Sequence, residues 1–291
     1  MLIPINSSPL SELFYKLYSY DSLSYQIEML HMLCQSYKSM LEKPENKDSL
    51  NMITKRILIL KYELIAKFCH YTENFGAFAY AFSKSYGLNE INDTFRIVSD
   101  YQIDTIKCFY KNLLKHKKIN DRERIILLKI FSYPTNTTTD NTFDSLLEES
   151  LKNLKSLIVE IGSCYTDKKL NLIESYNAYK HGYRLLFGKE LVNKIDTITF
   201  INQGGKEDYV TVNDEDMDEY LKLKNYCNLL FEIMLYNHNT KYELLKDGNE
   251  KKMNLKFLKN QNSNFFIHEN TYNLKINIKN KTKISYLISN I

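Results

Sequence analysis

One stretch of the chain repeats apolar residues at spacings of three or four without interruption. Such spacings return to one face of an α-helix, which turns by about 100° per residue. The pattern predicts a single helix over residues 50–86, about 55 Å long at 1.5 Å per residue. The residues that carry it are Leu50, Ile53, Ile57, Leu60, Leu64, Phe68, Tyr71, Phe75, Phe78 and Phe82.

The rest of the sequence also predicts long helices and few tight turns. The 291 residues include only eight glycines and four prolines, the residues that most often interrupt helices. Helical spacings predict a helix over 11–43, which forms an antiparallel hairpin with the helix over 50–86. Another helix is expected over 89–115, and a short one extends to residue 131 from an N-cap at Asp121. The predicted fold class is therefore all-α, with long antiparallel helices.

A segment without apolar periodicity divides the chain into two predicted helical modules. Residues 133–142 are rich in Thr and Asn, which is typical of a linker. They separate an N-terminal module of long helices, 1–132, from a second helical module, 143–250. Within the second module, β-branched residues on both sides of a Gly-Gly pair predict an inserted β-hairpin at 197–212. Residues 251–291 are predicted to form a basic tail.

The basic tail carries a strong excess of positive charge. Eight lysines and one glutamate give it a charge of +7, so the other residues sum to −3 in a chain of +4. Alternating apolar residues around Asn280-Lys281 allow a C-terminal β-hairpin. Such a segment either contacts phosphates without sequence specificity or forms a sheet edge whose lysines discourage strand pairing.

Several kinds of site have no counterpart in the sequence. The five cysteines are far apart, no pair has the spacing of metal ligands, and no HExxH sequence occurs. Gly204-Gly205-Lys206 lacks the spacing of a phosphate-binding loop. We therefore expect no metal, no nucleotide and no other cofactor. The sequence has no leader and no run of about 18 apolar residues, so we expect a cytoplasmic protein that does not contact a membrane.

Residues 174–184 concentrate polar side chains that are suited to chemistry. We expect them on a helix that extends over about 167–187. At helical spacing, a polar strip within about 80° of arc is formed by Glu174, Asn177, His181 and Arg184. An apolar stripe on the other side is formed by Leu172, Tyr176, Tyr179, Tyr183 and Leu186.

The polar strip contains the groups that RNA cleavage through the 2′-hydroxyl requires. His181 can accept a proton near neutral pH, and Asn177, one turn earlier, can orient its ring. Arg184 can supply positive charge to a phosphate. The candidate catalytic residues are therefore His181, Asn177 and Arg184, and the candidate binding residues are Lys180, Tyr176, Tyr179 and Glu174. The alternative interpretation is a structural role, because a helical histidine beside Lys and Gly is often a residue that faces solvent or caps a partner.

Residues 176–181, Tyr-Asn-Ala-Tyr-Lys-His, resemble the motif of HEPN domains. These are small all-helical modules of toxins, defence systems and RNA-processing proteins. Their motif is Arg, a polar residue such as Asn, a few variable residues and then His. Asn177 and His181 match it in type and spacing, whereas Tyr176 stands where the family has Arg. With the flanking helices counted, the resemblance extends over about 143–240.

The resemblance implies partners as well as a fold. In HEPN ribonucleases, the Arg and His of two subunits meet across a dimer interface and cleave RNA without a metal. A homodimer and RNA are therefore the implied partners, and His181 is the implied proton-transfer residue. Because Tyr176 is neutral at pH 7, it cannot make the charge-assisted phosphate contact of the family's Arg.

Three functional hypotheses follow. The first is a HEPN-like, non-catalytic module of a cytosolic defence or RNA-processing system, which associates with RNA or with protein. The second is a metal-independent ribonuclease that uses His181. The third is a purely structural helical adaptor. RNA cleavage by the purified protein would identify the ribonuclease, and salt-dependent RNA binding would separate an RNA-associated module from an adaptor.

Overall fold

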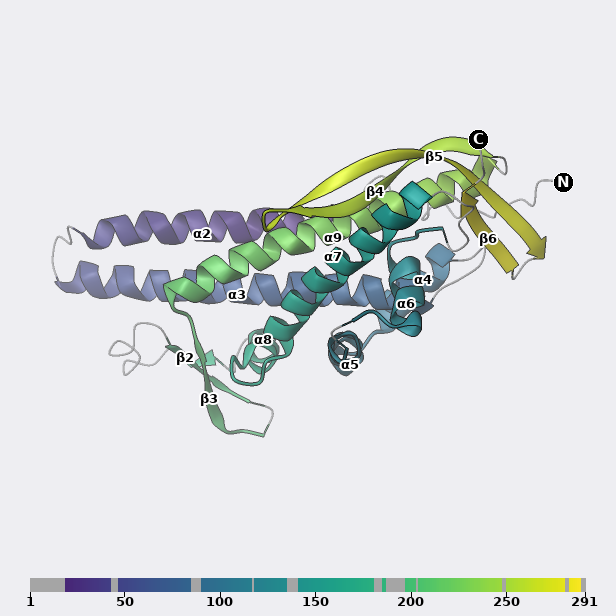
Figure 1. Ribbon diagram of the computed structural model, residues 1–291. Helices are drawn as coiled ribbons and strands as arrows, with labels where there is room; N and C mark the ends of the chain where they lie inside the picture. Colours follow the sequence, from purple (N-terminus) through teal and green to yellow (C-terminus); the bar gives the residue numbers. More distant parts are fainter. Residues whose placement is uncertain are drawn as a thin grey trace. The chain divides into compact units, whose positions relative to one another are not determined.

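The computed structural model of the protein is predominantly α-helical and contains two antiparallel sheets (Figure 1). It describes residues 19–42, 47–84, 90–116, 118–134, 141–180, 185–186, 197–202, 204–247, 250–280 and 283–288. The helices are α2 (Ser22–Leu41), α3 (Lys47–Lys84), α4 (Glu90–Asp100), α5 (Ile103–Leu114), α6 (Asp121–Ile130), α7 (Asn141–Thr166), α8 (Leu172–Lys180) and α9 (Asp214–Asp247). The strands are β1 (Leu185–Leu186), β2 (Thr197–Ile201), β3 (Glu207–Thr211), β4 (Lys251–Gln261), β5 (Asn264–Asn280) and β6 (Lys283–Ile288). The prediction of a mainly helical fold is confirmed, with more strand than the hairpins that were expected.

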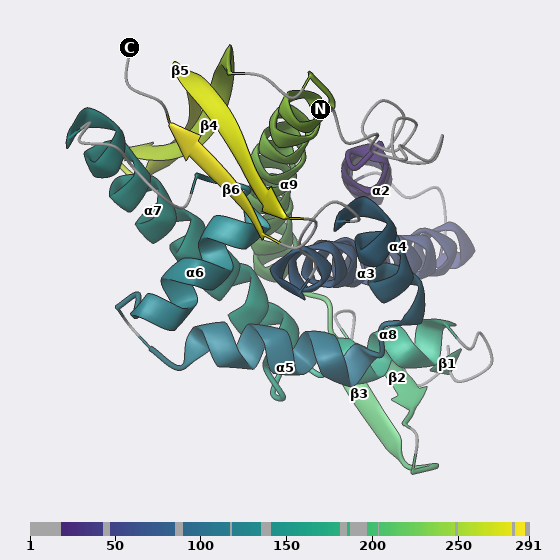
Figure 2. The same cartoon turned by 90° about the vertical axis from the view of Figure 1, so that its right-hand side faces the viewer.

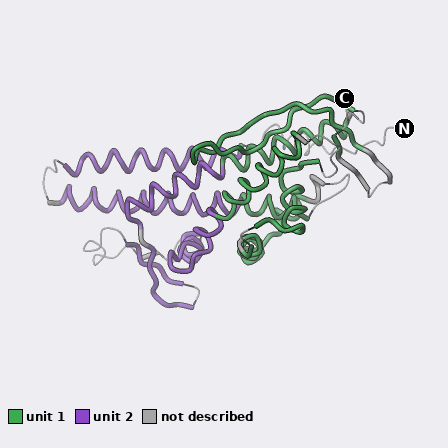
Figure 3. The backbone as a smooth tube through the Cα atoms, viewed as in Figure 1, with its two compact units in different colours: residues 1–19, 75–159, 228–291 green, residues 20–74, 160–227 purple. Residues whose placement is uncertain are grey.

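The chain forms two compact units (Figure 3). Unit 1 comprises residues 1–19, 75–159 and 228–291, and unit 2 comprises 20–74 and 160–227. Helices α3, α7 and α9 contribute residues to both units. The predicted division at 133–142 stays a prediction, and residues 135–140 of that linker lie outside the described residues.

In unit 2, α2 and the first part of α3 lie side by side as an antiparallel pair (Figure 1). Cys34 of α2 packs in one buried cluster with Ile53 and Ile57 of α3. The Arg56 guanidinium donates a 3.2 Å hydrogen bond to the Tyr37 hydroxyl. The predicted hairpin of two long helices is therefore confirmed over the described residues, and α3 is one unbroken helix up to Lys84.

In unit 1, two details of the predicted helices are wrong. The helix expected over 89–115 is two helices, α4 and α5, because Gln102 between them adopts an extended backbone with φ −108° and ψ 149°. Gln102 lies between Val98 and Ile106, where the helical spacing of apolar residues is interrupted. The N-cap of α6 is Asn120 and not Asp121: Asn120 Oδ1 accepts a hydrogen bond from the Glu123 amide at 2.9 Å. Glu123 Oε2 accepts one in return from the Asn120 amide at 3.2 Å, which completes a capping box.

The segment predicted as a basic tail forms the sheet of unit 1, in the order β4-β5-β6 (Figure 2). The predicted C-terminal hairpin is confirmed, since Leu274 pairs with Ile288 and β5 continues antiparallel to β6. The longer hairpin of β4 and β5 was not expected. Its two turn residues, Asn262 and Ser263, have φ of 52° and 67°. Two successive residues with positive φ are typical of the two-residue turns that join antiparallel strands.

Polar side chains from α7 and α9 cover the edge of β4 that does not face β5. The Asn237 side chain both donates to the Lys256 carbonyl at 3.0 Å and accepts from the Lys256 amide at 2.8 Å. Ser150 Oγ accepts from the Leu258 amide at 2.9 Å, and Asn153 donates to the Leu258 carbonyl at 3.1 Å. These side chains therefore satisfy backbone groups that an edge strand otherwise exposes.

In unit 2, the helix predicted over 167–187 is wrong at both ends. Helix α8 begins only at Leu172, because residues 168–171 form a turn, and it ends at Lys180. Leu185 and Leu186 form strand β1, which pairs with β2. Pairing with a strand from a later part of the chain outweighs the local helical spacing. The hairpin predicted at 197–212 is confirmed by the antiparallel pair of β2 and β3.

Candidate functional site

The segment that resembles the HEPN motif lies on α8 in unit 2, where contacts with α3 hold it. The Tyr62 hydroxyl donates a 2.7 Å hydrogen bond to the backbone carbonyl of Ser175, which is fully buried. The Tyr179 hydroxyl donates to Glu63 Oε2, also at 2.7 Å. The rings of Tyr62 and Tyr179 pack edge to face with centroids 5.9 Å apart. The tyrosine side of α8 therefore packs against α3, as the predicted apolar stripe requires.

The residue before α8 connects this helix to the small sheet of unit 2. Asn171 has a left-handed backbone with φ of 51°, a conformation that Asn tolerates better than most residues. Its side-chain amide donates to Asp208 Oδ1 at 2.9 Å and to the Tyr209 carbonyl at 3.1 Å. Both partners belong to β3, so the start of α8 is attached to the sheet while its tyrosines face α3.

Four side chains of α3 and α8 form a mixed cluster at the C-terminal end of α8. Lys180 Nζ donates to both carboxylate oxygens of Glu73, at 3.1 and 2.9 Å. The same ammonium group lies 4.3 Å from the ring centroid of Tyr176, a cation–π contact. Tyr176 stacks on His70 at a centroid distance of 6.3 Å. Glu73 is 2% exposed and Lys180 39%, so the lysine neutralises a buried carboxylate.

His70 is the member of this cluster whose ordinary pKa lies closest to neutral pH. Burial lowers the pKa of the imidazole from its ordinary value of 6.5, and the Lys180 and Lys67 charges lower it further, against the opposing effect of Glu73. The ring is therefore neutral at pH 7 and can accept a proton. Burial and the Glu63 carboxylate raise the pKa of Tyr179 to about 12, which keeps its hydroxyl protonated and donating.

The predicted site residues are only partly placed together. Five of the seven lie on α8, where Tyr176 and Lys180 join the cluster and Tyr179 contacts α3. Glu174 and Asn177 are half-buried and lie three residues apart on α8. His181 and Arg184 lie outside the described residues.

Sequence reasoning did not find the partners of α8 on α3. His70 belongs to no motif in the sequence, and the pairing of Glu73 with Lys180 joins residues 107 positions apart. No sequence signal marks this pairing, because the same stretch of α3 also carries Lys61 and Lys67, and the burial of Glu73 is visible only in the structure. A buried carboxylate needs a partner, because an isolated buried charge is very costly.

The cluster is suited to holding a helix in place and is poorly suited to phosphate chemistry. A phosphate requires positive charge that is not already compensated, whereas the Lys180 ammonium is bonded to both oxygens of Glu73. Within the described residues, no group of three or more His, Cys, Asp and Glu side chains is arranged to hold a metal ion.

Comparison with models of protein families, with curated proteins and with solved structures finds no match. Among the helices of the described ranges, none is both long enough and apolar enough to cross a membrane.

Proposed function

We propose that this chain is a HEPN-like helical protein that acts as a non-catalytic protein-interaction module, with a second copy of the chain as its partner. One observation carries the proposal: an exposed apolar stripe on α2. Its members are between 44% and 65% exposed and fall within about 100° of arc at helical spacing. The apolar stripe of α2 consists of Tyr25, Met29, Met32, Leu33 and Met40.

The composition of the stripe favours a protein partner. Contiguous exposed apolar surface is typical of interaction sites, whereas scattered single residues are ordinary. Methionine is flexible and polarisable, and it recurs on surfaces that bind other helices. Leu50 and Met52, in the first turns of α3, are exposed as well and extend the apolar character of this end of unit 2.

The charges near the stripe favour a second copy over RNA or an acidic peptide. The two charged residues of α2 are both bonded within unit 2: Glu28 to Lys224, and Lys38 to Asp214 at 2.6 Å. The stripe itself carries no charged residue that would select a charged partner. A two-fold axis would place this uncharged surface against its own copy, which is how most homodimers form.

The non-catalytic part of the proposal rests on α8. Tyr176, where HEPN ribonucleases have Arg, is 4% exposed and packs against His70. The Lys180 charge is compensated by Glu73. Both features support a structural role for this part of the motif.

The test is the oligomeric state in solution. Wild type should be a dimer by analytical ultracentrifugation, and Met32→Lys should weaken the dimer at least about tenfold, because it places a charge in the interface and removes apolar area worth about 1.5–3 kcal/mol. Ile125→Lys is the matched control: Ile125 is 56% exposed but lies on α6. Circular dichroism should be unchanged in both variants.

A monomeric wild type at 100 µM, or a dimer that Met32→Lys leaves intact, contradicts the proposal. Incubation of the protein with RNA in the absence of metal tests the ribonuclease hypothesis. We expect no cleavage. Robust cleavage that His181→Ala abolishes would replace the proposal with the ribonuclease hypothesis.

A further inference from the structure

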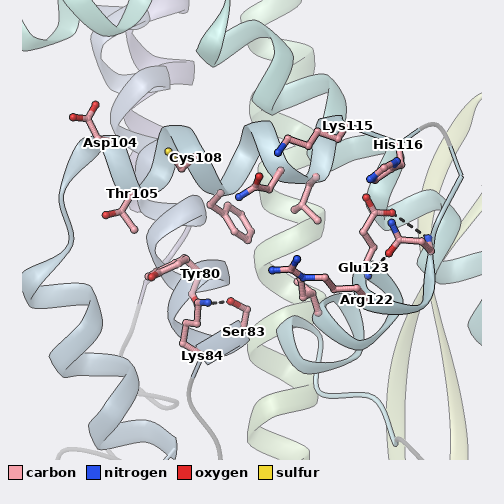
Figure 4. Close-up of a pocket in the computed structure, with 15 residues that line it drawn as sticks. Tyr80, Ser83, Lys84, Asp104, Thr105, Cys108, Lys115, His116, Arg122 and Glu123 are labelled. Carbon is pink, nitrogen blue, oxygen red and sulfur yellow. Dashed lines mark hydrogen bonds between the residues drawn. The ribbon is translucent and has the colours of Figure 1, made fainter.

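Unit 1 contains a cavity of about 670 Å³ between the C-terminal end of α3 and helices α5 and α6 (Figure 4). This volume lies within the range of about 300–1,000 Å³ that is usual for sites of small molecules. It is distinct from the α8 cluster and from the apolar stripe of α2, both of which belong to unit 2.

Three cations from three different elements border the cavity: Lys84 at the end of α3, Lys115 after α5 and Arg122 on α6 (Figure 4). All three side chains are exposed. Within the described part of the chain, no carboxylate pairs with Lys115 or Arg122. Asp104, an acid of the lining, is already 3.5 Å from Lys107. The cavity therefore offers uncompensated positive charge to an anion, and Arg and Lys bind phosphate oxygens through strong charge-assisted hydrogen bonds.

An aromatic wall adjoins these cations. Tyr80 of α3 and Phe109 of α5 pack edge to face with centroids 6.3 Å apart, and both line the cavity. Lys84 Nζ lies 5.5 Å from the Tyr80 ring centroid, so one cation and one ring face the same space. Stacking on an aromatic side chain is the usual way in which proteins hold a planar base, and it contributes about 1–3 kcal/mol per base.

The cavity also has a hydrogen-bond acceptor that lacks a donor. Glu123 is 4% exposed and lines the cavity. Its Oε2 accepts from Lys155 at 2.7 Å and from the Asn120 amide at 3.2 Å. Its Oε1 is buried and has no hydrogen-bond partner within the described structure. An unpaired buried acceptor is unusual in a folded protein, and an N–H or O–H group of a ligand would satisfy it.

We propose that this cavity binds a nucleotide. Lys84, Lys115 and Arg122 contact the phosphate, Tyr80 stacks on the base, and Glu123 Oε1 accepts a hydrogen bond from the sugar or the base. The sequence did not suggest such a site, because it uses no glycine-rich loop and its residues come from three separate helical segments. The nucleotide is either free or the 5′-phosphorylated end of an RNA chain, which present the same groups.

The experiment is calorimetric titration of the full chain with AMP, UMP, adenosine and inorganic phosphate. Because the base and the phosphate use different contacts, we expect at least one nucleotide to bind at least about tenfold more tightly than adenosine or phosphate alone. Arg122→Ala and Lys115→Ala should each weaken its binding about tenfold or more. Lys111→Ala is the matched control, one turn before Lys115 on the exposed surface of α5 and outside the lining. It should bind as wild type does.

A 5′-phosphorylated RNA of about six nucleotides and its 5′-hydroxyl counterpart separate the two sources. Tighter binding of the phosphorylated RNA than of either mononucleotide assigns the site to an RNA end, and the reverse order assigns it to a free nucleotide. The proposal is overturned if no nucleotide or RNA binds at millimolar concentration, or if phosphate binds as tightly as AMP and UMP. It is also overturned if Arg122→Ala and Lys115→Ala, with unchanged circular dichroism, bind as wild type does.

Discussion

The ion pair between Lys155 and Glu123 supports a sharp prediction about stability. Both side chains are 5% exposed, and their charged atoms are 2.7 Å apart. Lys155 Nζ also donates to the carbonyls of His116 and Lys118, at 2.7 and 3.2 Å, which fixes the loop between α5 and α6. One buried ammonium group thus serves a carboxylate and two backbone carbonyls in unit 1.

Lys155→Met keeps the length of the side chain and removes all three hydrogen bonds. It leaves the Glu123 carboxylate buried without its cation, and breaking a buried pair in this way costs about 3–5 kcal/mol. At roughly 2–4 °C per kcal/mol for a protein of this size class, the melting temperature should fall by about 6–20 °C. Urea unfolding followed by circular dichroism measures the free energy directly.

The exposed pair of Arg124 and Glu148 provides the control. Its partners are 36% and 56% exposed, so Arg124→Ala should cost at most about 1 kcal/mol. A loss below about 1 kcal/mol at pH 7 for Lys155→Met would refute the reasoning.

Three further outcomes are expected. Gly76→Ala should destabilise the protein by about 1–3 kcal/mol in urea, because the new Cβ would lie 2.6 Å from Cγ2 of the buried Ile106, and a neutral or stabilising result would contradict this packing. Since the pKa of His70 is lowered from 6.5, its contribution to stability is complete above pH 6.5 and is lost as the pH falls below it. Between pH 7.5 and 5, the free energy of unfolding measured in urea should therefore fall less for His70→Gln than for wild type. With a thiol reagent at pH 8, exposed Cys108 should react at once, whereas Cys69, whose pKa burial raises well above 9.0, should react only after unfolding; equal rates would contradict these placements.

The parts of the fold that depend on local spacing could be predicted from the sequence. Helix α3 is the clearest case, because its apolar residues repeat from Leu50 to Phe82 and no proline or polar cluster competes with them. The end of α8 could not be predicted in this way. Leu186 continues the helical apolar spacing, yet it pairs with Thr199 in a sheet. Strand pairing across such a distance leaves no trace in local periodicity.

The candidate sites depend even more on contacts between distant segments. The partner of Lys180 on α3 could be guessed only from the general need of a buried Glu73 for a cation. The cavity of unit 1 brings together Lys84 from the end of α3, Lys115 from the residue after α5 and Arg122 from the first turn of α6. Single lysines in a lysine-rich chain give no signal of that convergence. A motif on one helix is visible in a sequence, whereas a site assembled from three segments requires the fold.

The side chains along β4 have a consequence for how the sheet of unit 1 can be extended. Asn237, with one donor and one acceptor on a single planar amide, bonds the Lys256 backbone as the peptide group of a neighbouring strand would. An incoming strand, from another copy or from a fused peptide, would have to break that pair and the bonds of Ser150 and Asn153 to Leu258 before gaining any of its own. Helices α7 and α9 thus set the width of the sheet on this side, and β4 cannot serve as a template for aggregation while they stay in place.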